Sequence, residues 1–368
     1  MSVPPPASRL TPHVVVGLSG GVDSAVSAYL LQQQGYRVSG LYMVNWTEDE
    51  EGYCTAAQDF QDARAVCEEL SIPLHRVDFS REYRGRVFNR FLADYAAGKT
   101  PNPDVLCNRE VKFQPFREHA LRLGADFIAT GHYARLSQAT DGPRLLRAED
   151  ANKDQTYFLA TVDRAMLDRV LFPVGGLTKP EVRKVAEQAG LPNHRKRDST
   201  GICFIGERSM REFLARYLQP KPGAIEDDRG HSVGEHPGLM YFTLGQRRGL
   251  GIGGKRGAAE APWFVTGKDT KRNVLNVSQN ERDPLLYSHM LVTAEFHWIR
   301  KPEPLPTSLH ARIRHRQSLQ ECTAQQRDDG RVEIVFAAPQ RAAVAGQYAV
   351  LYDGAECLGG GEIESVAA

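Results

Sequence analysis

The chain has 368 residues, more than one compact domain usually holds, so we expect two or three domains with separate cores. With 41% hydrophobic and 25% charged residues the composition excludes wholesale disorder, and a net charge of +1 neither supports nor excludes a nucleic-acid partner. No run approaches the ~20 apolar residues of a membrane helix, and the start from Met1 to Pro6 lacks the apolar stretch of a secretory signal, so we expect a cytoplasmic protein with no membrane partner.

The first half of the chain alternates short β-branched runs with helical patterns, which is typical of βαβ units and predicts an α/β fold with a Rossmann-like parallel sheet of at least four strands. The predicted strands are His13–Val16, Arg37–Val44, Leu74–Asp78 and Phe127–Thr130, and the predicted helices are Ser24–Gln33, Thr55–Leu70 and Phe113–Leu123. Ligands bind beyond the carboxyl ends of the strands in such sheets. We therefore look for the site in the loops that start at Gly17, Met43, Asp78 and Gly131.

The first of these loops has the composition of a phosphate site. Ser19-Gly20-Gly21-Val22-Asp23-Ser24 follows a strand and opens a helix, where backbone N–H groups and the helix dipole attract an anion. The glycines permit close approach, and Asp23 can order the loop or help hold Mg²⁺ among phosphate oxygens. The Gly-Lys-Ser/Thr ending of the Walker loop is absent, which disfavours ordinary γ-phosphate hydrolysis. The alternative is a glycine turn that only connects strand to helix.

The six cysteines are too sparse for a disulfide scaffold, and none forms a Cys-x-x-Cys pair, so we expect no metal centre and any cysteine chemistry must join residues distant in sequence. Cys107 ends the segment Pro101-Asn102-Pro103-Asp104-Val105-Leu106-Cys107, where two prolines predict a stiff loop until after the cysteine. Asp104 places a carboxylate three residues before the thiol. A free cysteine is more often a small buried hydrophobe, and for Cys67, on an apolar helical stripe, we accept that interpretation.

A second notable cysteine follows a predicted helix. Thr178 has the position of an N-cap, with Pro180 and Glu181 in the first turn and Gly190 at the end. The basic run His194 to Arg197 then leads to Cys203, which is flanked by glycines. Nearby positive charge lowers the pKa of a thiol.

Beyond Leu218 the pattern changes, and we divide the chain into residues 1–218, a small, partly β domain at 219–280 and a C-terminal all-β barrel at 281–368. The predicted barrel strands are Leu291–Phe296, Ser308–Arg316, Gln320–Gln325, Val332–Phe336 and Gln347–Tyr352. Period-two spacing puts Arg312, Arg314 and Arg316 on one face of a strand, which predicts a phosphate-binding stripe. The alternative is a solubilising face on an edge strand. Arg195 to Arg197 and Arg247-Arg248 could add phosphate contacts.

These motifs carry a family resemblance. The phosphate loop resembles the pyrophosphatase loop of the N-type ATP pyrophosphatases, the PP-loop family, which cleave ATP between the α and β phosphates. Together with Asn102-Pro103-Asp104 to Cys107, Gly131-His132-Tyr133, Lys153-Asp154-Gln155 and Gly201-Ile202-Cys203-Phe204, in that order, it resembles the tRNA-specific 2-thiouridylases from about His13 to the C-terminus. Two positions depart from the family: Ala25 replaces a common serine and His315 a common tyrosine.

The resemblance implies 2-thiolation of the wobble uridine in tRNA anticodons, with ATP and Mg²⁺ as cofactors. ATP would adenylate the uracil O2, Cys203 would carry a persulfide from a sulfur donor protein, and Cys107 would be the second catalytic thiol, leaving a disulfide between them for an external reductant. Asp104 would be the base, unless it is a structural cap. The matching nucleotide-binding positions are Gly17, Leu18, Ser19, Gly20, Gly21, Val22, Asp23, Ser24, Met43 and Gly131.

The target base is shielded in a stacked loop, so it must be extruded and read by its edges. The positions that match tRNA contacts of the family are Asn102, Pro103, Asp104, His132, Lys153, Asp154, Gln155, Arg314, His315 and Gln347. For Lys153 and Asp154 the alternative is an exposed charge pair.

Two other functions compete with this one. The chain could be another ATP pyrophosphatase that acts on a small molecule, or a noncatalytic RNA-binding protein that uses nucleotide as a switch. A 4-thiouridine synthase is disfavoured because its usual extra RNA-binding domain is not evident before the phosphate loop.

Overall fold

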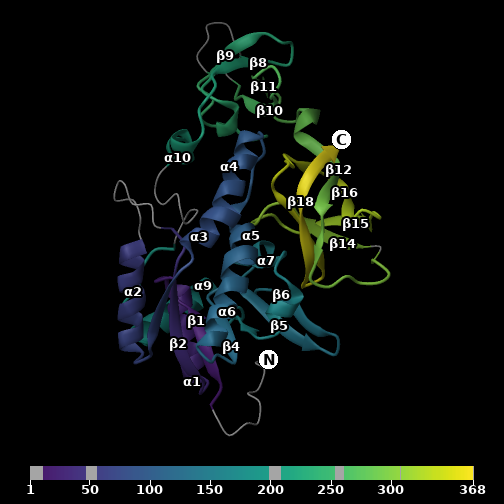
Figure 1. The fold of residues 1–368 in the computed structure, drawn as a ribbon. Coiled ribbons are helices and arrows are strands. Elements are labelled where there is room, and N and C mark those ends of the chain that lie inside the picture. The colour runs from purple at the N-terminus through teal and green to yellow at the C-terminus, as the bar shows by residue number, and fades with distance from the viewer. Residues whose placement is uncertain (1–10, 47–55, 199–208, 253–260, 307, 368) are drawn as a thin grey trace.

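The computed structural model describes residues 11–46, 56–198, 209–252, 261–306 and 308–367. Its N-terminal half is built on a five-stranded parallel sheet (Figure 1). The strands, in spatial order, are β3 (Leu74–Asp78), β2 (Arg37–Val44), β1 (His13–Gly17), β4 (Phe127–Thr130) and β7 (Val170–Leu171). The predicted parallel sheet is confirmed, and β2, β3 and β4 have the predicted bounds.

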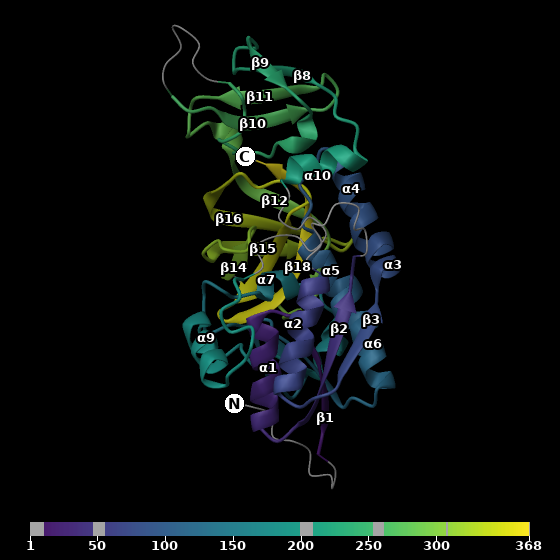
Figure 2. The ribbon, with the colours of Figure 1, turned by 90° about the vertical axis from the view of Figure 1, so that its left-hand side faces the viewer.

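Alternation along β1 sends side chains to two cores, as the period of two in a strand requires. Val14 and Val16 belong to one core and Val15 to the other. Helices on the Val14 side are α1 (Val22–Gln33), α2 (Ala56–Glu69) and α9 (Lys179–Gln188). The Val15 side is covered by α3 (Ser80–Tyr83), η1 (Arg84–Phe88), α4 (Asn89–Ala96), α5 (Pro103–Cys107), η2 (Asn108–Phe113) and α6 (Gln114–Arg122). In Figures 1 and 2, α5 lies beyond the carboxyl edge of this sheet.

The C-terminal region is a closed antiparallel barrel, as predicted. Its strands are β12 (Tyr287–Glu295), β14 (Leu309–Arg312), β15 (Gln320–Gln326), β16 (Arg331–Arg341), β17 (Tyr348–Asp353) and β18 (Glu356–Ala367), and pairing of β12 with β18 closes it. The short β13 (His297–Trp298) also pairs with β18. No strand was predicted over β18, whose Gly359, Gly360 and Gly361 have a low strand propensity.

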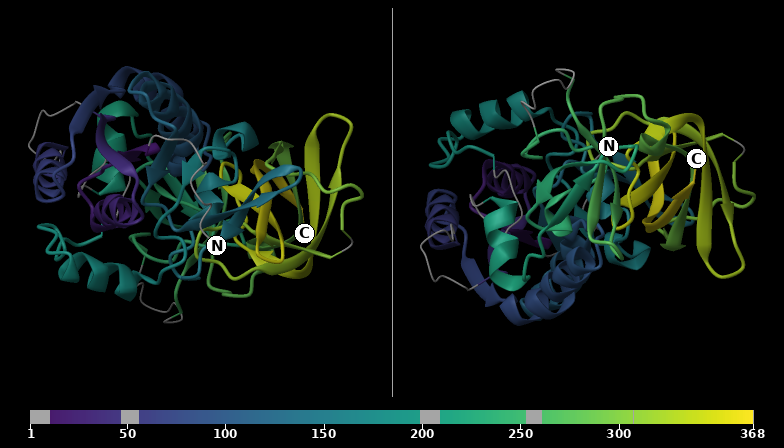
Figure 3. Two further views of the ribbon diagram at one scale, coloured as in Figure 1. Left: turned by 90° about the horizontal axis from the view of Figure 1, so that it is seen from below. Right: turned by 90° about the horizontal axis from the view of Figure 1, so that it is seen from above.

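A hairpin from the N-terminal half extends the barrel sheet. It consists of β5 (Ala134–Ala139) and β6 (Gly142–Arg147), and β6 pairs with β18 through Leu146 and Glu356. Figure 3 shows this teal hairpin reaching from the parallel sheet to the yellow barrel. Two short helices, α7 (Thr156–Leu159) and α8 (Arg164–Leu167), follow it. The strand after the site residues Gly131 and His132 is therefore tied to the barrel.

A small four-stranded sheet forms the central region. It is ordered β10 (Phe264–Asp269), β11 (Val274–Ser278), β8 (Gly223–Glu226) and β9 (Ser232–His236), with η3 (Leu239–Tyr241) and η4 (Pro284–Leu286) beside it. It has its own apolar core around Ile225 and Val265. The preceding helix α10 (Met210–Tyr217) instead packs Phe213 against Phe88 in the core of the N-terminal half. Within the described ranges, no helix is long and apolar enough to cross a bilayer.

Candidate active site

The predicted phosphate loop joins β1 to α1 and is ordered by its own hydroxyls. The Ser24 hydroxyl donates to the Gly21 carbonyl at 3.1 Å and accepts from the Ser19 amide at 3.2 Å. Gly21 is the N-cap of α1, and the helix begins at Val22, so the first N–H groups of the helix face the loop. This arrangement makes the loop an anion site of the kind found at helix N-termini.

Two glycines of the site are required by close packing. Gly20 has φ +77°, and a Cβ there would lie 2.3 Å from the backbone oxygen of Asp59. A Cβ on Gly131, directly after β4, would lie 2.7 Å from the Ser24 amide nitrogen. A larger residue at 131 would therefore push the carboxyl end of β4 against the first turn of α1.

Other predicted nucleotide positions fall at the same edge of the sheet. Gly17 ends β1, and Met43, half-buried, lies one residue before the end of β2. The side chains of Leu18 and Val22 are buried in the core with 2% and 4% exposure, so only their backbone faces the loop. The site thus offers backbone groups and short side chains to a ligand.

Asp23, in the first turn of α1, is the hub of a polar cluster. Its Oδ1 accepts from the Tyr133 hydroxyl at 2.8 Å and lies 2.6 Å from the Lys179 ammonium. Burial, together with the charge and hydrogen bond of Asp23, raises the pKa of Tyr133 well above its usual range, so the phenol keeps its proton. Lys179 also contacts Asp198, which contacts Lys153 and Arg183.

The segment before Cys107 is helical, which corrects the predicted stiff loop. Asn102 is the N-cap of α5, and its side-chain oxygen accepts from the Asp104 amide at 3.2 Å. Pro103 is tolerated because it takes the first helical position, where no amide hydrogen is needed. The cap is Asn102, so the alternative role of Asp104 as the cap is wrong. Asp104 and Cys107 stand three residues apart on one helix and so share a face, with Cβ atoms about 5–6 Å apart.

Burial shapes the chemistry of this face. Cys107 is 2% exposed, within the core on the Val15 side of the sheet. Burial also raises the pKa of the Asp104 carboxyl, against the opposing charge of Lys112. The Asp104 side chain makes no hydrogen bond or ion pair with any residue that the structure describes. A carboxyl with a raised pKa, whose oxygens are not committed to other hydrogen bonds, suits the role of a proton acceptor beside a reacting group.

His132 lies close behind the loop as a neutral imidazole. Its Nδ1 is 2.8 Å from the Thr130 hydroxyl, and its ring lies near Phe113 and Phe172. Burial, reinforced by the charge of Lys112, lowers the pKa of His132 to about 3. An RNA contact made by this ring would use a neutral donor or acceptor.

The interpretation of Lys153 and Asp154 as an exposed charge pair is wrong. Lys153 lies 2.6 Å from Asp198, while the Asp154 carboxylate is fully buried and lies 2.6 Å from Arg312. Asp154 also accepts from the Thr156 hydroxyl at 2.9 Å and from the Ala148 amide at 3.2 Å. The Asp154 carboxylate is thus committed to protein groups.

The arginine stripe also needs correction, because β14 ends at Arg312 and the next residues turn away. Arg312 is buried on Asp154, whereas Arg314 donates to the carbonyls of Arg341 and Ala342 and Arg316 is exposed. The strand ends four residues before Arg316, so the period of two on which the stripe depended does not extend to Arg314 and Arg316.

The remaining predicted RNA contacts lie where the barrel meets the N-terminal half. The His315 ring is 4.4 Å from the Phe158 ring and its Nε2 is 3.0 Å from the Asp154 carbonyl oxygen. Gln347 donates to the Thr100 carbonyl at 2.8 Å, just before the Asn102 cap. Gln155 accepts from the Tyr133 amide at 2.9 Å. The structure therefore connects these residues with α5 and with the phosphate loop.

Cys203 lies outside the described residues, as does Cys54; Asp198 is the last residue described before that gap. In the preceding basic run, the Lys196 ammonium contacts Asp59 at 2.6 Å, whereas Arg195 and Arg197 are exposed. Cys67 is buried with 3% exposure, and burial raises its pKa to about 12, which confirms its interpretation as an inert core residue.

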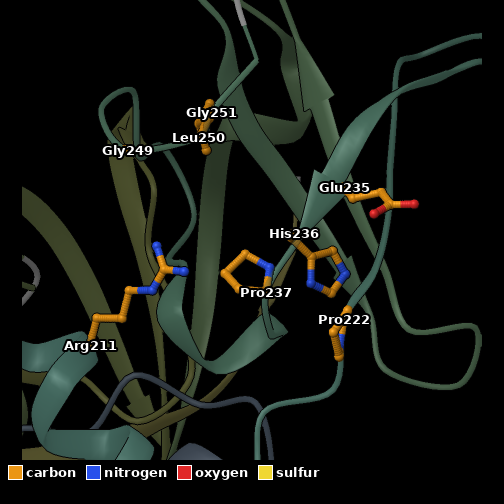
Figure 4. Close-up of a pocket in the computed structure, with 8 residues that line it drawn as sticks. All are labelled: Arg211, Pro222, Glu235, His236, Pro237, Gly249, Leu250 and Gly251. Carbon is orange, nitrogen blue, oxygen red and sulfur yellow. The ribbon is translucent and has the colours of Figure 1, made fainter.

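The central region has a separate hollow of about 360 Å³, lined by Arg211, Pro222, Glu235, His236, Pro237, Gly249, Leu250 and Gly251 (Figure 4). The Glu235 side chain points away from it, and the His236 ring is held by the Asn273 carbonyl at 3.1 Å. The hollow contains none of the predicted nucleotide or thiol positions, so we do not assign the reaction to it.

Three family models match the chain: a tRNA methyl transferase HUP domain over residues 12–207, a tRNA methyl transferase PRC-barrel domain over 211–279 and an aminomethyltransferase beta-barrel domain over 288–363. The tRNA-specific 2-thiouridylase MnmA of Alcanivorax borkumensis is 56% identical over 96% of this chain and 98% of its own. The proteins of that name from Vibrio cholerae and Escherichia coli O139:H28 are 55% and 54% identical, over 95% and 97% of this chain and 96% and 98% of theirs. A 4-thiouridine synthetase in complex with RNA and ATP covers 56% of this chain and 50% of its own at 19% identity, with a TM-score of 0.35, too low to add to these matches.

Proposed function

The chain belongs to the family of tRNA-specific 2-thiouridylases and is a tRNA sulfurtransferase, and we propose that it replaces O2 of the wobble uridine with sulfur at the expense of ATP. One observation carries the proposal furthest: Asp104 and Cys107 share a face of α5, beyond the sheet edge that holds the phosphate loop (Figure 2). A carboxyl, a thiol and a polyphosphate site at the carboxyl edge of one sheet are the groups that this reaction needs.

The first step is activation of the base. The uracil O2 attacks the α-phosphate of ATP, pyrophosphate leaves, and the base carries AMP on O2, which turns a poor leaving group into a good one. The first backbone N–H groups of α1, which begins at Val22, hold the phosphates. Gly17, Met43 and Gly131 border the nucleoside, and the Asp23 carboxylate would help to hold Mg²⁺, whose charge would offset that of the phosphates. Asp104 takes a proton at the base or at the thiol.

The second step is sulfur transfer. The Cys107 thiolate attacks the inner sulfur of a persulfide on Cys203, which forms the Cys107–Cys203 disulfide and releases sulfide, and sulfide adds to C2 and expels AMP with the old O2. An external reductant returns the two thiols, and a persulfide-bearing donor protein recharges Cys203. The reaction takes place in the cytoplasm, where such reductants keep thiols reduced.

The RNA is held at the junction of barrel and sheet. Asn102, Pro103 and Asp104 face the extruded base, while Lys153, Gln155, Arg314, His315 and Gln347 lie around them, with His132 behind. Asp154 acts on the RNA through the positions of His315 and Arg312 rather than through its own carboxylate, which is supported by its complete burial.

The proposal is tested by measuring AMP and pyrophosphate formation with and without tRNA. We expect AMP only when tRNA is present, ATP binding intact in Cys107→Ser and Cys203→Ser, and no thiolated product from either variant. Cys322→Ala, in the barrel core, is the matched control and should keep product formation. AMP formation without tRNA would favour a small-molecule substrate, and product formation by Cys107→Ser would refute the role of that thiol.

A further inference from the structure

A cation that contacts the first turn of α1 comes from α9, far away in sequence. The start of this helix is fixed by a capping box between Thr178 and Glu181, and the Lys179 amide donates to Asp150 at 2.9 Å. The Lys179 side chain is only 10% exposed, and its Nζ lies 2.6 Å from Asp23 Oδ1. A lysine stem anchored at a capped helix start therefore brings an ammonium to the first turn of α1.

A second carboxylate holds the same ammonium from the other side. Asp198 Oδ1 lies 2.8 Å from Lys179 Nζ, and Asp198 is also contacted by Lys153 at 2.6 Å and by Arg183 at 2.8 Å. Burial alone would raise the pKa of Asp198, but hydrogen bonds and charges of Lys153 and Lys179 lower it to about 2. Asp198 can give up Lys179 and still keep two cations, whereas Asp23 has no other cation among the described residues.

The loop itself contains no lysine, although a polyphosphate that binds to backbone N–H groups is stabilised further by a mobile positive charge. Asp23 belongs to the same first turn of α1 as those N–H groups, so an anion on the loop comes within reach of the Lys179 ammonium. A lysine stem has four rotatable carbons, and a movement of the ammonium alone can exchange a carboxylate oxygen for a phosphate oxygen.

We infer that Lys179 is the lysine of this phosphate site: it binds the polyphosphate of ATP, and on nucleotide binding its ammonium exchanges the Asp198 carboxylate for phosphate oxygens. The inference rests on the proposed function. Asp198 competes with the nucleotide for Lys179 and retains Lys153, one of the expected tRNA contacts. The Asp198 carboxylate therefore contacts both Lys179, at the nucleotide site, and Lys153, an expected tRNA contact.

A purely structural role predicts a different outcome. If Lys179 only pinned Asp23 to Asp198, removing either end of the Lys179–Asp198 pair would lower stability alike and leave nucleotide binding unchanged. If Lys179 binds phosphate, the two substitutions act on nucleotide affinity in opposite directions. The sign of the Asp198→Asn effect on affinity separates the two.

The test measures dissociation constants of the full chain for ATP, for pyrophosphate alone and for adenosine by titration calorimetry. We expect Lys179→Met to weaken ATP and pyrophosphate about 10- to 100-fold, the range of one charge-assisted hydrogen bond, and to leave adenosine unchanged. Lys179→Arg should recover most of the loss, and Asp198→Asn should bind ATP more tightly than the parent protein, because it no longer competes for Lys179. Lys184→Met removes an exposed lysine of the same helix and is the matched control.

Three outcomes decide the matter. Lys179→Met affinity for pyrophosphate within about threefold of the parent protein overturns the inference and leaves the proposed function standing. Equal loss of adenosine and pyrophosphate also overturns it, because a phosphate ligand acts on the phosphates alone. If the parent protein binds pyrophosphate through Lys179 but forms no AMP with tRNA, the proposed function fails and the inference stands.

Discussion

The buried pair between Asp154 and Arg312 gives a prediction whose size follows from the structure. The two side chains are 0% and 4% exposed, their closest atoms are 2.6 Å apart, and they join the N-terminal half to strand β14 of the barrel. Removing Asp154 leaves the Arg312 charge buried without a carboxylate, which typically costs about 3–5 kcal/mol, whereas removing Arg312 leaves Asp154 with Arg147, whose Nε lies 3.6 Å from Asp154 Oδ2. We expect Asp154→Asn to lower the free energy of unfolding by about that amount, and Arg312→Met to lower it by less, because Arg147 still contacts Asp154.

The assay is urea unfolding followed by circular dichroism, with the double variant completing a thermodynamic cycle. The double variant should be less destabilised than the sum of the two single variants, because neither charge is then left alone. Arg316→Met, which removes an exposed arginine four residues further on, is the control and should change stability by less than about 0.5 kcal/mol.

Binding of tRNA to the same variants completes the test. Because the Asp154 carbonyl oxygen lies 3.0 Å from His315 Nε2, a disturbed Asp154 should weaken RNA binding only together with a loss of stability. A variant Asp154→Asn as stable as the parent protein, but with weakened tRNA binding, would mean that the carboxylate contacts RNA directly, and the reasoning from burial would be refuted.

Three further predictions concern the site. Burial raises the pKa of Asp104, so the acid limb of the pH–rate profile should lie above the usual range of an aspartate and disappear in Asp104→Asn; an unchanged limb in that variant would assign it elsewhere. Gly131→Ala places a Cβ 2.7 Å from the Ser24 amide and should weaken ATP binding, measured by calorimetry, whereas Gly176→Ala, with open space around its Cβ, should not. The pKa of Asp198 is depressed to about 2, so its ion pairs stabilise the fold above the ordinary pKa of about 3.8 and are lost as pH falls between the two; acid unfolding of Asp198→Asn should therefore lack this component, and an unaltered acid transition would contradict it.

The sequence predicted the parallel sheet well because its buried strands are short, apolar and bounded by glycine and polar residues. No strand was predicted over β18, because glycine has a low strand propensity. Its glycines are nevertheless needed where the barrel packs tightly: a Cβ on Gly359 would lie 2.1 Å from the His297 carbonyl oxygen, and one on Gly361 2.9 Å from Thr293. The local sequence pattern indicates which backbone conformations a glycine permits. It does not indicate which neighbouring atoms leave no room for a side chain.

The site was predictable where its signal is local and unpredictable where it is tertiary. The phosphate loop and the spacing of Asp104 and Cys107 are visible in short motifs, although Pro103 was taken as a helix breaker when it starts the helix. The Lys179–Asp23 contact joins residues 156 positions apart, and the Asp154–Arg312 contact joins residues 158 apart. The periodicity of a sequence does not predict contacts between residues so far apart. Asp154 was therefore predicted to be a tRNA contact or part of an exposed charge pair, and Lys179 was not predicted as a site residue.

The most direct test of the central claim is mass analysis of tRNA nucleosides and of AMP after incubation with ATP, Mg²⁺ and a sulfide source, using tRNA labelled with ¹⁸O at uracil O2. We expect the wobble uridine to appear as 2-thiouridine and the label to appear in AMP, because the activated oxygen leaves on the α-phosphate. Unmodified uridine, or 2-thiouridine formed with unlabelled AMP, would contradict the account.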